Sequence, residues 1–82
     1  MATTLKVKSE FTFVTEKKDD KVINYFTCSA LGAQRIYLNS GTEYIEEVQL
    51  VHGTVYSGTI YCNAFVSQQG SLILSAMIIN FV

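Results

Sequence analysis

The chain has 82 residues, with six lysine and arginine residues against seven aspartate and glutamate residues. This length predicts a single domain, 1–82, whose small core needs reinforcement by a disulfide, a metal or self-association. The net charge of −1 argues against strong nonspecific binding of nucleic acid, which is typical of strongly basic domains.

A charged hairpin is predicted over residues 5–30. Its first strand alternates strictly, which is typical of a strand with one wet face. The core-facing parity comprises Leu5, Val7, Phe11 and Phe13, and the wet parity comprises Lys6, Lys8, Glu10 and Thr12. The polar run 16–21 predicts the tip, and because it lacks an Asn-Gly or Asp-Gly pair we expect a loop longer than two residues. The return strand, about 22–30, turns Val22, Phe26, Cys28 and Ala30 toward the core and leaves Ile23 and Tyr25 outside.

The middle of the chain carries weaker signals. Residues 31–34 predict a turn or bulge, residues 35–39 a short strand, and residues 39–42 a turn. The segment 42–51 has apolar residues at helical spacing near its start and β-rich sequence at its end. We therefore expect a short helical turn there that leads into a strand.

Two apolar strands follow. The first covers 53–66 with a bend at Gly58, and residues 67–70 form the last turn. From 71 to 82 both parities are apolar, which indicates a strand that is covered on both faces. In a chain this short one cover is the core, and we expect the other to be a second subunit. The residues predicted to face that subunit are Ile73, Met77, Ile79 and Phe81.

About five strands, with no proline and little helix, indicate an all-β protein. The leading architecture is a small five-stranded OB-like Greek-key barrel with a protruding β-hairpin, assembled as a homodimer, because a barrel closes most strand edges at this size. A small two-sheet sandwich is the alternative. The apolar stretch 72–82 is too short to span a bilayer as a helix, so no membrane partner is expected.

Catalytic and metal chemistry find little support. His52 is the single histidine and, beside Gly53, is expected to be a solvated loop residue. Two cysteines do not complete a zinc site with it, and Cys28 and Cys62 lie on core parities where buried, inert thiols are expected. We therefore expect no enzyme, no cofactor, no metal and no small-molecule substrate. No apolar signal segment follows Met1, so we expect a cytoplasmic location, in the host cytoplasm if the protein is viral.

Binding of single-stranded nucleic acid has better support, because all six cations precede residue 36 and aromatic residues lie among them. Cations follow the phosphates of a single strand, and aromatic side chains stack on its bases. The residues predicted to contact nucleic acid are Lys6, Lys8, Lys17, Lys18, Lys21, Tyr25, Arg35, Tyr61 and Phe65, with Tyr37 and Tyr56 as further stacking candidates. Two alternatives remain open. Asp19 and Asp20 neutralise much of the tip, and Tyr61 with Phe65 can form a cross-strand packing pair instead.

Several segments occur in the order found in one viral family. They are the strand Leu5-Lys6-Val7-Lys8, the hairpin 16–26 with Tyr25, then Tyr56, Gly58, the strand 59–66 and the motif Gln68-Gln69-Gly70-Ser71-Leu72. In these segments the chain resembles the filamentous-phage single-stranded DNA-binding (helix-destabilising) proteins, which are dimeric OB-type domains of about this length. The resemblance implies cooperative coating of phage single strands during DNA replication. The chain departs from the family at Gln69, where a stacking aromatic is usual, at 22–25, where Gly-Lys-Pro-Tyr is common, and in the last strand, which lacks the family's basic residues.

Two functions follow as expectations. The first is a dimeric protein that binds single-stranded DNA without reading its sequence. The second is a small β-sheet module for protein binding or assembly, such as a phage structural or host-inhibitory protein. The acidic, apolar residues after Arg35 favour this second function, because they suit a protein interface better than a polyanion.

Overall fold

The computed structural model describes residues 3–32, 34–39, 41–45 and 49–81. The elements are β1 (Thr3–Lys18), β2 (Lys21–Cys28), the 3₁₀ helix η1 (Ser29–Leu31), β3 (Arg35–Tyr37), β4 (Glu43–Tyr44), β5 (Val55–Val66) and β6 (Leu72–Phe81). Within these ranges, no helix has the length and apolar character needed to cross a membrane.

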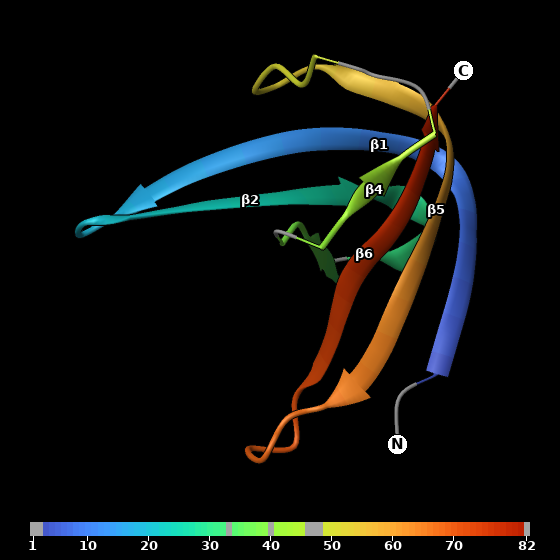
Figure 1. The fold of residues 1–82 in the computed structure, drawn as a ribbon. Coiled ribbons are helices and arrows are strands. Elements are labelled where there is room, and N and C mark those ends of the chain that lie inside the picture. The colour runs from blue at the N-terminus through green and yellow to red at the C-terminus, as the bar shows by residue number, and fades with distance from the viewer. Residues whose placement is uncertain (1–2, 33, 40, 46–48, 82) are drawn as a thin grey trace.

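Five of the strands close into a barrel (Figure 1). β1 pairs with β2 and with β5, β2 pairs with β3, and β5 pairs with β6, all of them antiparallel. The parallel pairing of β3 with β6 closes the ring. β1 reaches both neighbours because it is long and bends, so that residues 3–12 pair with β5 and residues 11–18 pair with β2. The predicted all-β, five-stranded OB-like barrel is confirmed, and β4 is an extra short strand along β6.

Alternation along the strands fills the barrel with apolar side chains. The buried core comprises Val7, Phe11, Phe13, Phe26, Cys28, Ile36, Ile60, Cys62, Leu74, Ala76, Ile79 and Phe81. The ring of Phe26 packs edge-on against two others, with centroids 6.2 Å from Phe11 and 5.4 Å from Phe81. Edge-to-face pairs of this kind contribute about 0.5–1.5 kcal/mol beyond the burial of their apolar area. The core therefore joins β1, β2 and β6 through aromatic contacts.

The side chains of the first hairpin that were predicted to face the core are buried within the barrel and exposed toward the ends of the hairpin strands. Leu5, Val22 and Ala30 are exposed. Val22 lies in the part of β2 beyond its pairing with β3, and Ala30 lies in η1. The free thiols of Cys28 and Cys62 are buried, as predicted. Burial raises the pKa of the Cys62 thiol to about 11, with a smaller contribution from Cys28, so the Cys62 thiol is protonated at neutral pH.

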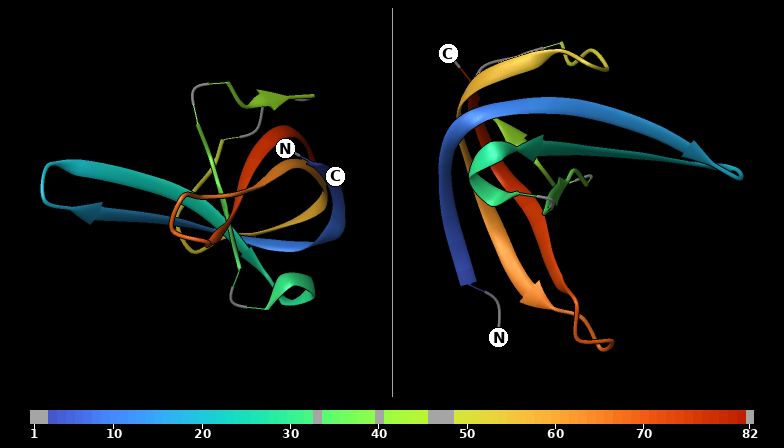
Figure 2. Two further views of the ribbon diagram at one scale, coloured as in Figure 1. Left: turned by 90° about the horizontal axis from the view of Figure 1, so that it is seen from below. Right: turned by 180° about the vertical axis from the view of Figure 1, so that it is seen from behind.

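The β1–β2 hairpin extends beyond the barrel, as both views in Figure 2 show. Its tip is a tight turn, because Lys18 pairs with Lys21 and only Asp19 and Asp20 lie between them. The expected longer loop is therefore wrong. Asp19 adopts a positive φ of 56°, a conformation that aspartate tolerates better than most residues and that two-residue hairpin turns require.

A loop before β5 supports the root of this hairpin along the free edge of β1. The backbone N–H of Phe13 donates to the carbonyl of Thr54 at 3.1 Å, and the N–H of Gly53 donates to the carbonyl of Phe13 at 2.8 Å. One step further out, the N–H of Thr15 donates to Nδ1 of His52 at 3.0 Å. His52 is exposed, as expected, and it also anchors the hairpin.

A β-bulge in β6 changes which side chains of the last strand face the core. Cys62 pairs with Ala76 and Tyr61 pairs with Ile78, so Met77 has no partner on β5. The extra residue reverses the parity of the strand after it. Ile79 and Phe81, which were predicted to face a second subunit, are core residues with 1% and 6% exposure. That part of the prediction is wrong.

The two other residues predicted to face a second subunit lie outside the barrel. Ile73 is half-buried and Met77 is 40% exposed. The two apolar parities of β6 therefore have an explanation within one chain, since the residues before the bulge and those after it use opposite parities to reach the same core.

The segment 42–51 begins as a strand, because β4 runs parallel to the end of β6 and pairs Glu43 with Ile78 and Tyr44 with Ile79. The N–H of Ile45 continues this pattern by donating to the carbonyl of Ile79 at 2.9 Å. The expected helical turn is not present in 42–45 or 49–51, and residues 46–48 lie outside the described ranges.

Candidate nucleic-acid interface

The two faces of the hairpin differ in charge because of strand register. Lys18 pairs with Lys21, and Val14 pairs with Tyr25, so these four side chains share the outer face of the barrel. Lys17 pairs with Val22 on the opposite face. Two of the three lysines at the tip therefore lie on the same side as Tyr25.

Tyr25 lies under other side chains and is only 4% exposed. β3 pairs with β2 so that Tyr37 is opposite Tyr25, with ring centroids 5.9 Å apart. The guanidinium of Arg35 lies 4.5 Å above the Tyr25 ring. The prediction that Tyr25 is an exposed stacking platform is therefore wrong for this conformation, because β3 supplies a cover that the local pattern of β2 does not indicate.

A carboxylate fixes the phenol of Tyr25. Its hydroxyl donates to Oε1 of Glu16 at 2.7 Å, a length typical of a bond to a charged acceptor. This hydrogen bond, followed by burial, raises the pKa of Tyr25 above its ordinary value, and the nearby guanidinium of Arg35 opposes the shift. Tyr25 thus positions its neighbours, while Tyr37, which is less buried, presents more surface to a ligand.

Arg35 is an exposed cation on this face. Nη1 of Arg35 lies 3.9 Å from Oε2 of Glu16, and both side chains are 46% exposed. An exposed ion pair of this length contributes about 0–1 kcal/mol. The planar guanidinium has five N–H donors, so most of them stay available to an anion.

A cleft of about 560 Å³ opens beside Arg35, between β3 and the loop that joins β5 to β6. It is lined by Gln34, Arg35, Tyr37, Ser67, Gln69, Ser71, Leu72 and Ile73. Nε2 of Gln34 donates to the carbonyl of Leu72 at 3.1 Å and connects the two walls. The cleft therefore combines a guanidinium and a phenol ring with amides, hydroxyls and the apolar side chains of Leu72 and Ile73.

Most of the residues that line the cleft were not among the contacts predicted from the sequence. Arg35 was predicted and Tyr37 was a further candidate, but Gln34, Ser67 and Gln69 were not proposed as contacts. The signal available was topological, since in an OB-like barrel the loop between the fourth and fifth barrel strands flanks the face made by strands two and three.

The remaining residues predicted to contact nucleic acid lie in two places, one on the surface of β1 and β5 and the other close to the cleft. Lys6 and Lys8 lie on the stretch of β1 that pairs with β5, opposite Tyr61 and Thr59. Nζ of Lys6 is 5.9 Å from the centre of the Tyr61 ring, which is half-buried beneath it. Lys6, Lys8 and Tyr61 are thus not part of the Arg35 cleft.

Phe65 stays close to the cleft. It is 37% exposed and pairs with Ile73, whose side chain lines the cleft. It can be a packing partner of Ile73 and still offer part of its ring to a ligand.

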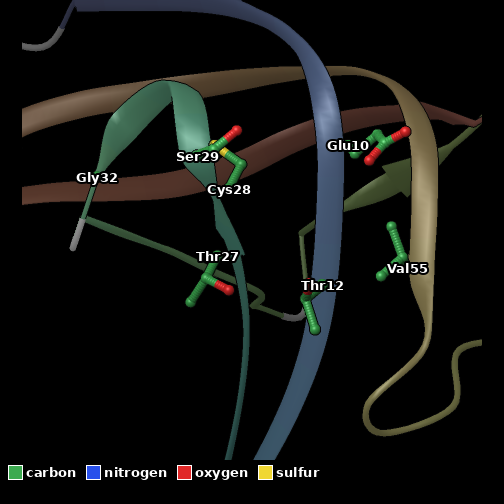
Figure 3. Close-up of a pocket in the computed structure, with 7 residues that line it drawn as sticks. All are labelled: Glu10, Thr12, Thr27, Cys28, Ser29, Gly32 and Val55. Atoms are coloured by element: carbon green, nitrogen blue, oxygen red, sulfur yellow. The ribbon is translucent and has the colours of Figure 1, made fainter.

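A second, smaller cavity of about 320 Å³ lies where β1 and β2 diverge (Figure 3). Its polar lining comes from Thr12, Thr27, Ser29 and the carboxylate of Glu10, and no cation lines it. This chemistry does not suit a phosphate. Within the described ranges no three His, Cys, Asp or Glu side chains gather in a way that could hold a metal ion.

Comparison of the chain with protein-family models, characterised proteins and solved structures found no match. The candidate interface therefore rests on the geometry of the residues described above.

Proposed function

We propose that the protein binds single-stranded DNA, without reading its sequence, on the outer face of β2 and β3. The observation that carries the proposal is the Arg35–Tyr37 cleft, bordered by the β5–β6 loop and continued by the Lys18–Lys21 side of the hairpin. OB-fold barrels bind oligonucleotides on this face and between the corresponding loops. The resemblance to filamentous-phage DNA-binding proteins supports the same ligand.

The spacing along the face suits several nucleotides. Thr27 is opposite Arg35, and Lys21 lies six positions before Thr27 along β2. At about 3.3 Å per residue the positive charges extend over about 20 Å. Sites on OB folds span about 4–16 nucleotides, so a short strand could contact Arg35 and the hairpin together.

The charge count predicts moderate affinity with a measurable dependence on salt. Three cations, Lys18, Lys21 and Arg35, lie on this face. For single strands each neutralised phosphate contributes about −0.7 to the slope of log affinity against log salt, so three give about −2. Stacking of one base on Tyr37 adds about 1–3 kcal/mol.

The test is a titration of fluorescent oligothymidine at several salt concentrations with two matched variants. Lys18→Ala should weaken binding and make the slope less negative by about 0.7, because it removes a phosphate contact. Lys17→Ala removes the same charge from the opposite face and should leave the slope unchanged. An absence of binding at low salt, or an equal effect of both variants, would contradict the proposal.

A second function is favoured by one specific feature, an apolar cluster at the end of β5 and β6. Val66 is 66% exposed and pairs with Leu72, which is 50% exposed, so these two apolar side chains lie together on one face of the strand pair. This cluster would suit self-association as a homodimer or a role as an assembly module, such as a phage structural protein. A Val66→Asp variant that sediments as the wild type does, over a wide concentration range, would remove this alternative.

A further inference from the structure

We propose that Glu16 is an internal competitor for the phosphate site on Arg35, so that Arg35 covers Tyr25 in the free protein and moves to a phosphate group when one binds. This inference rests on the proposed function and specifies how the same face is regulated. The three residues come from three strands, since Glu16 belongs to β1, Tyr25 to β2 and Arg35 to β3.

The two carboxylate oxygens of Glu16 make two contacts of unequal strength. Oε1 accepts the hydroxyl of Tyr25 at 2.7 Å, and Oε2 lies 3.9 Å from Nη1 of Arg35. The first contact is a short hydrogen bond to a side chain that is almost fully buried. The second is longer than a hydrogen bond and lies at the surface. Tyr25 thus holds Glu16 in place, whereas Glu16 holds Arg35 only loosely.

A phosphate group has the better chemistry for Arg35. A guanidinium donates two parallel hydrogen bonds to phosphate, with lengths of about 2.7–2.9 Å. The contact with Glu16 is not a pair of parallel hydrogen bonds and is longer than a hydrogen bond. Little binding energy is therefore lost when a phosphate replaces it. The carboxylate stays close to the incoming phosphate, however, and its negative charge weakens the binding that follows.

Movement of Arg35 would change the surface that is offered to a base. Its guanidinium lies 4.5 Å above the ring of Tyr25, and the ring of Tyr37 is 5.9 Å away. When Arg35 leaves, the covered face of Tyr25 opens beside Tyr37. The bound protein then presents two adjacent rings, and the burial of Tyr25 in the free protein is compatible with stacking in the complex.

The first experiment measures oligothymidine affinity for Glu16→Gln and for Glu43→Gln. Glutamine at 16 keeps an oxygen that accepts the Tyr25 hydroxyl and removes the charge. A carboxylate about 6 Å from a phosphate, at an effective dielectric constant of about 60, weakens binding about fivefold. Glu16→Gln should therefore bind about fivefold more tightly than the wild type.

Glu43 is the matched control, because it is exposed on β4 and its loss changes the net charge by the same amount. Glu43→Gln should change the affinity by less than twofold. Equal gains in the two variants would mean that only net charge matters, and a loss of affinity in Glu16→Gln would mean that Glu16 supports the site. Either result overturns the inference while leaving DNA binding intact.

The second experiment needs no DNA. Ring signals of Tyr25 in protein labelled with ¹³C-tyrosine are followed by NMR during addition of inorganic phosphate, with sodium chloride at equal ionic strength as the reference. Phosphate should shift the Tyr25 signals toward those of the Arg35→Ala variant, and chloride should not. Tyr25 signals that respond equally to the two salts would overturn the inference. A phosphate response without any oligothymidine binding would support the Arg35 site and refute the proposed function.

Discussion

Replacement of Gly58 by alanine should disrupt the closure of the barrel. Gly58 lies on β5 between Ser9 of β1 and Phe81 of β6, with a φ of 154°. A Cβ atom at this position would lie 2.3 Å from the carbonyl oxygen of Asn80 and 2.7 Å from Cα of Phe81. Both are backbone atoms, so no rotation of a side chain relieves the contact, and β6 must move.

The magnitude follows from two contributions. Unfavourable φ costs about 1–3 kcal/mol, and forcing packed segments apart costs about 1–3 kcal/mol. Together they cost about 2–6 kcal/mol, and we expect Gly58→Ala to lose about 3–4 kcal/mol, near the middle of that range. A domain of this length has about 4–12 kcal/mol of stability in total. The variant should therefore be near the limit of folding, with a melting temperature more than about 12 °C lower.

Gly70→Ala is the control for this experiment. Gly70 has a φ of 84°, but a Cβ atom there meets nothing within 4 Å. Its cost should be limited to backbone strain, about 1 kcal/mol or a decrease of about 4–8 °C in melting temperature. Thermal and urea unfolding followed by circular dichroism measure both variants. The reasoning is refuted if Gly58→Ala is no less stable than Gly70→Ala.

Three further predictions concern the core and its titratable groups. Ile79→Asp should unfold the protein, whereas Met77→Asp should change the stability by about 1 kcal/mol or less, because Ile79 is buried in the core and Met77 is exposed at the bulge; equal melting temperatures would contradict the bulge. The pKa of Tyr25 is raised above its ordinary value of about 10, so its contribution to stability is present below pH 10 and is lost as pH rises through the higher folded-state pKa; the urea midpoint should fall further between pH 8 and pH 11 for the wild type than for Tyr25→Phe, and parallel decreases would argue against the Glu16 contact. Cys28 and Cys62 should resist a thiol reagent at pH 8 in the native protein and react when urea unfolds it, because both are buried; rapid labelling of the folded protein would show that the core is open.

The strands could be predicted from the sequence because alternation is a local property. The inward positions Val7, Phe11 and Phe26 follow from a period of two, and they occupy the core in the structure. The same rule failed in β6 because a single unpaired residue, Met77, reverses parity, and apolar residues on both sides of it conceal the change. A bulge depends on pairing with another strand, and one-strand patterns do not contain that information.

The candidate interface was predicted only in part for a related reason. Arg35 and Lys18 were recognised by their charge. Whether two cations lie on the same face, however, depends on the point at which β1 stops pairing with β5 and begins to pair with β2. That exchange separates Lys6 and Lys8 from the hairpin. The cover over Tyr25 likewise comes from the pairing of β2 with β3.

Amide chemical-shift mapping with oligothymidine at low salt tests the proposed interface most directly. We expect the largest changes along β2 and β3, at Arg35 and Tyr37, and in the β5–β6 loop at Gln69, with smaller changes at the hairpin tip. Changes centred on Lys6 and Tyr61, or no changes at all, would contradict the account.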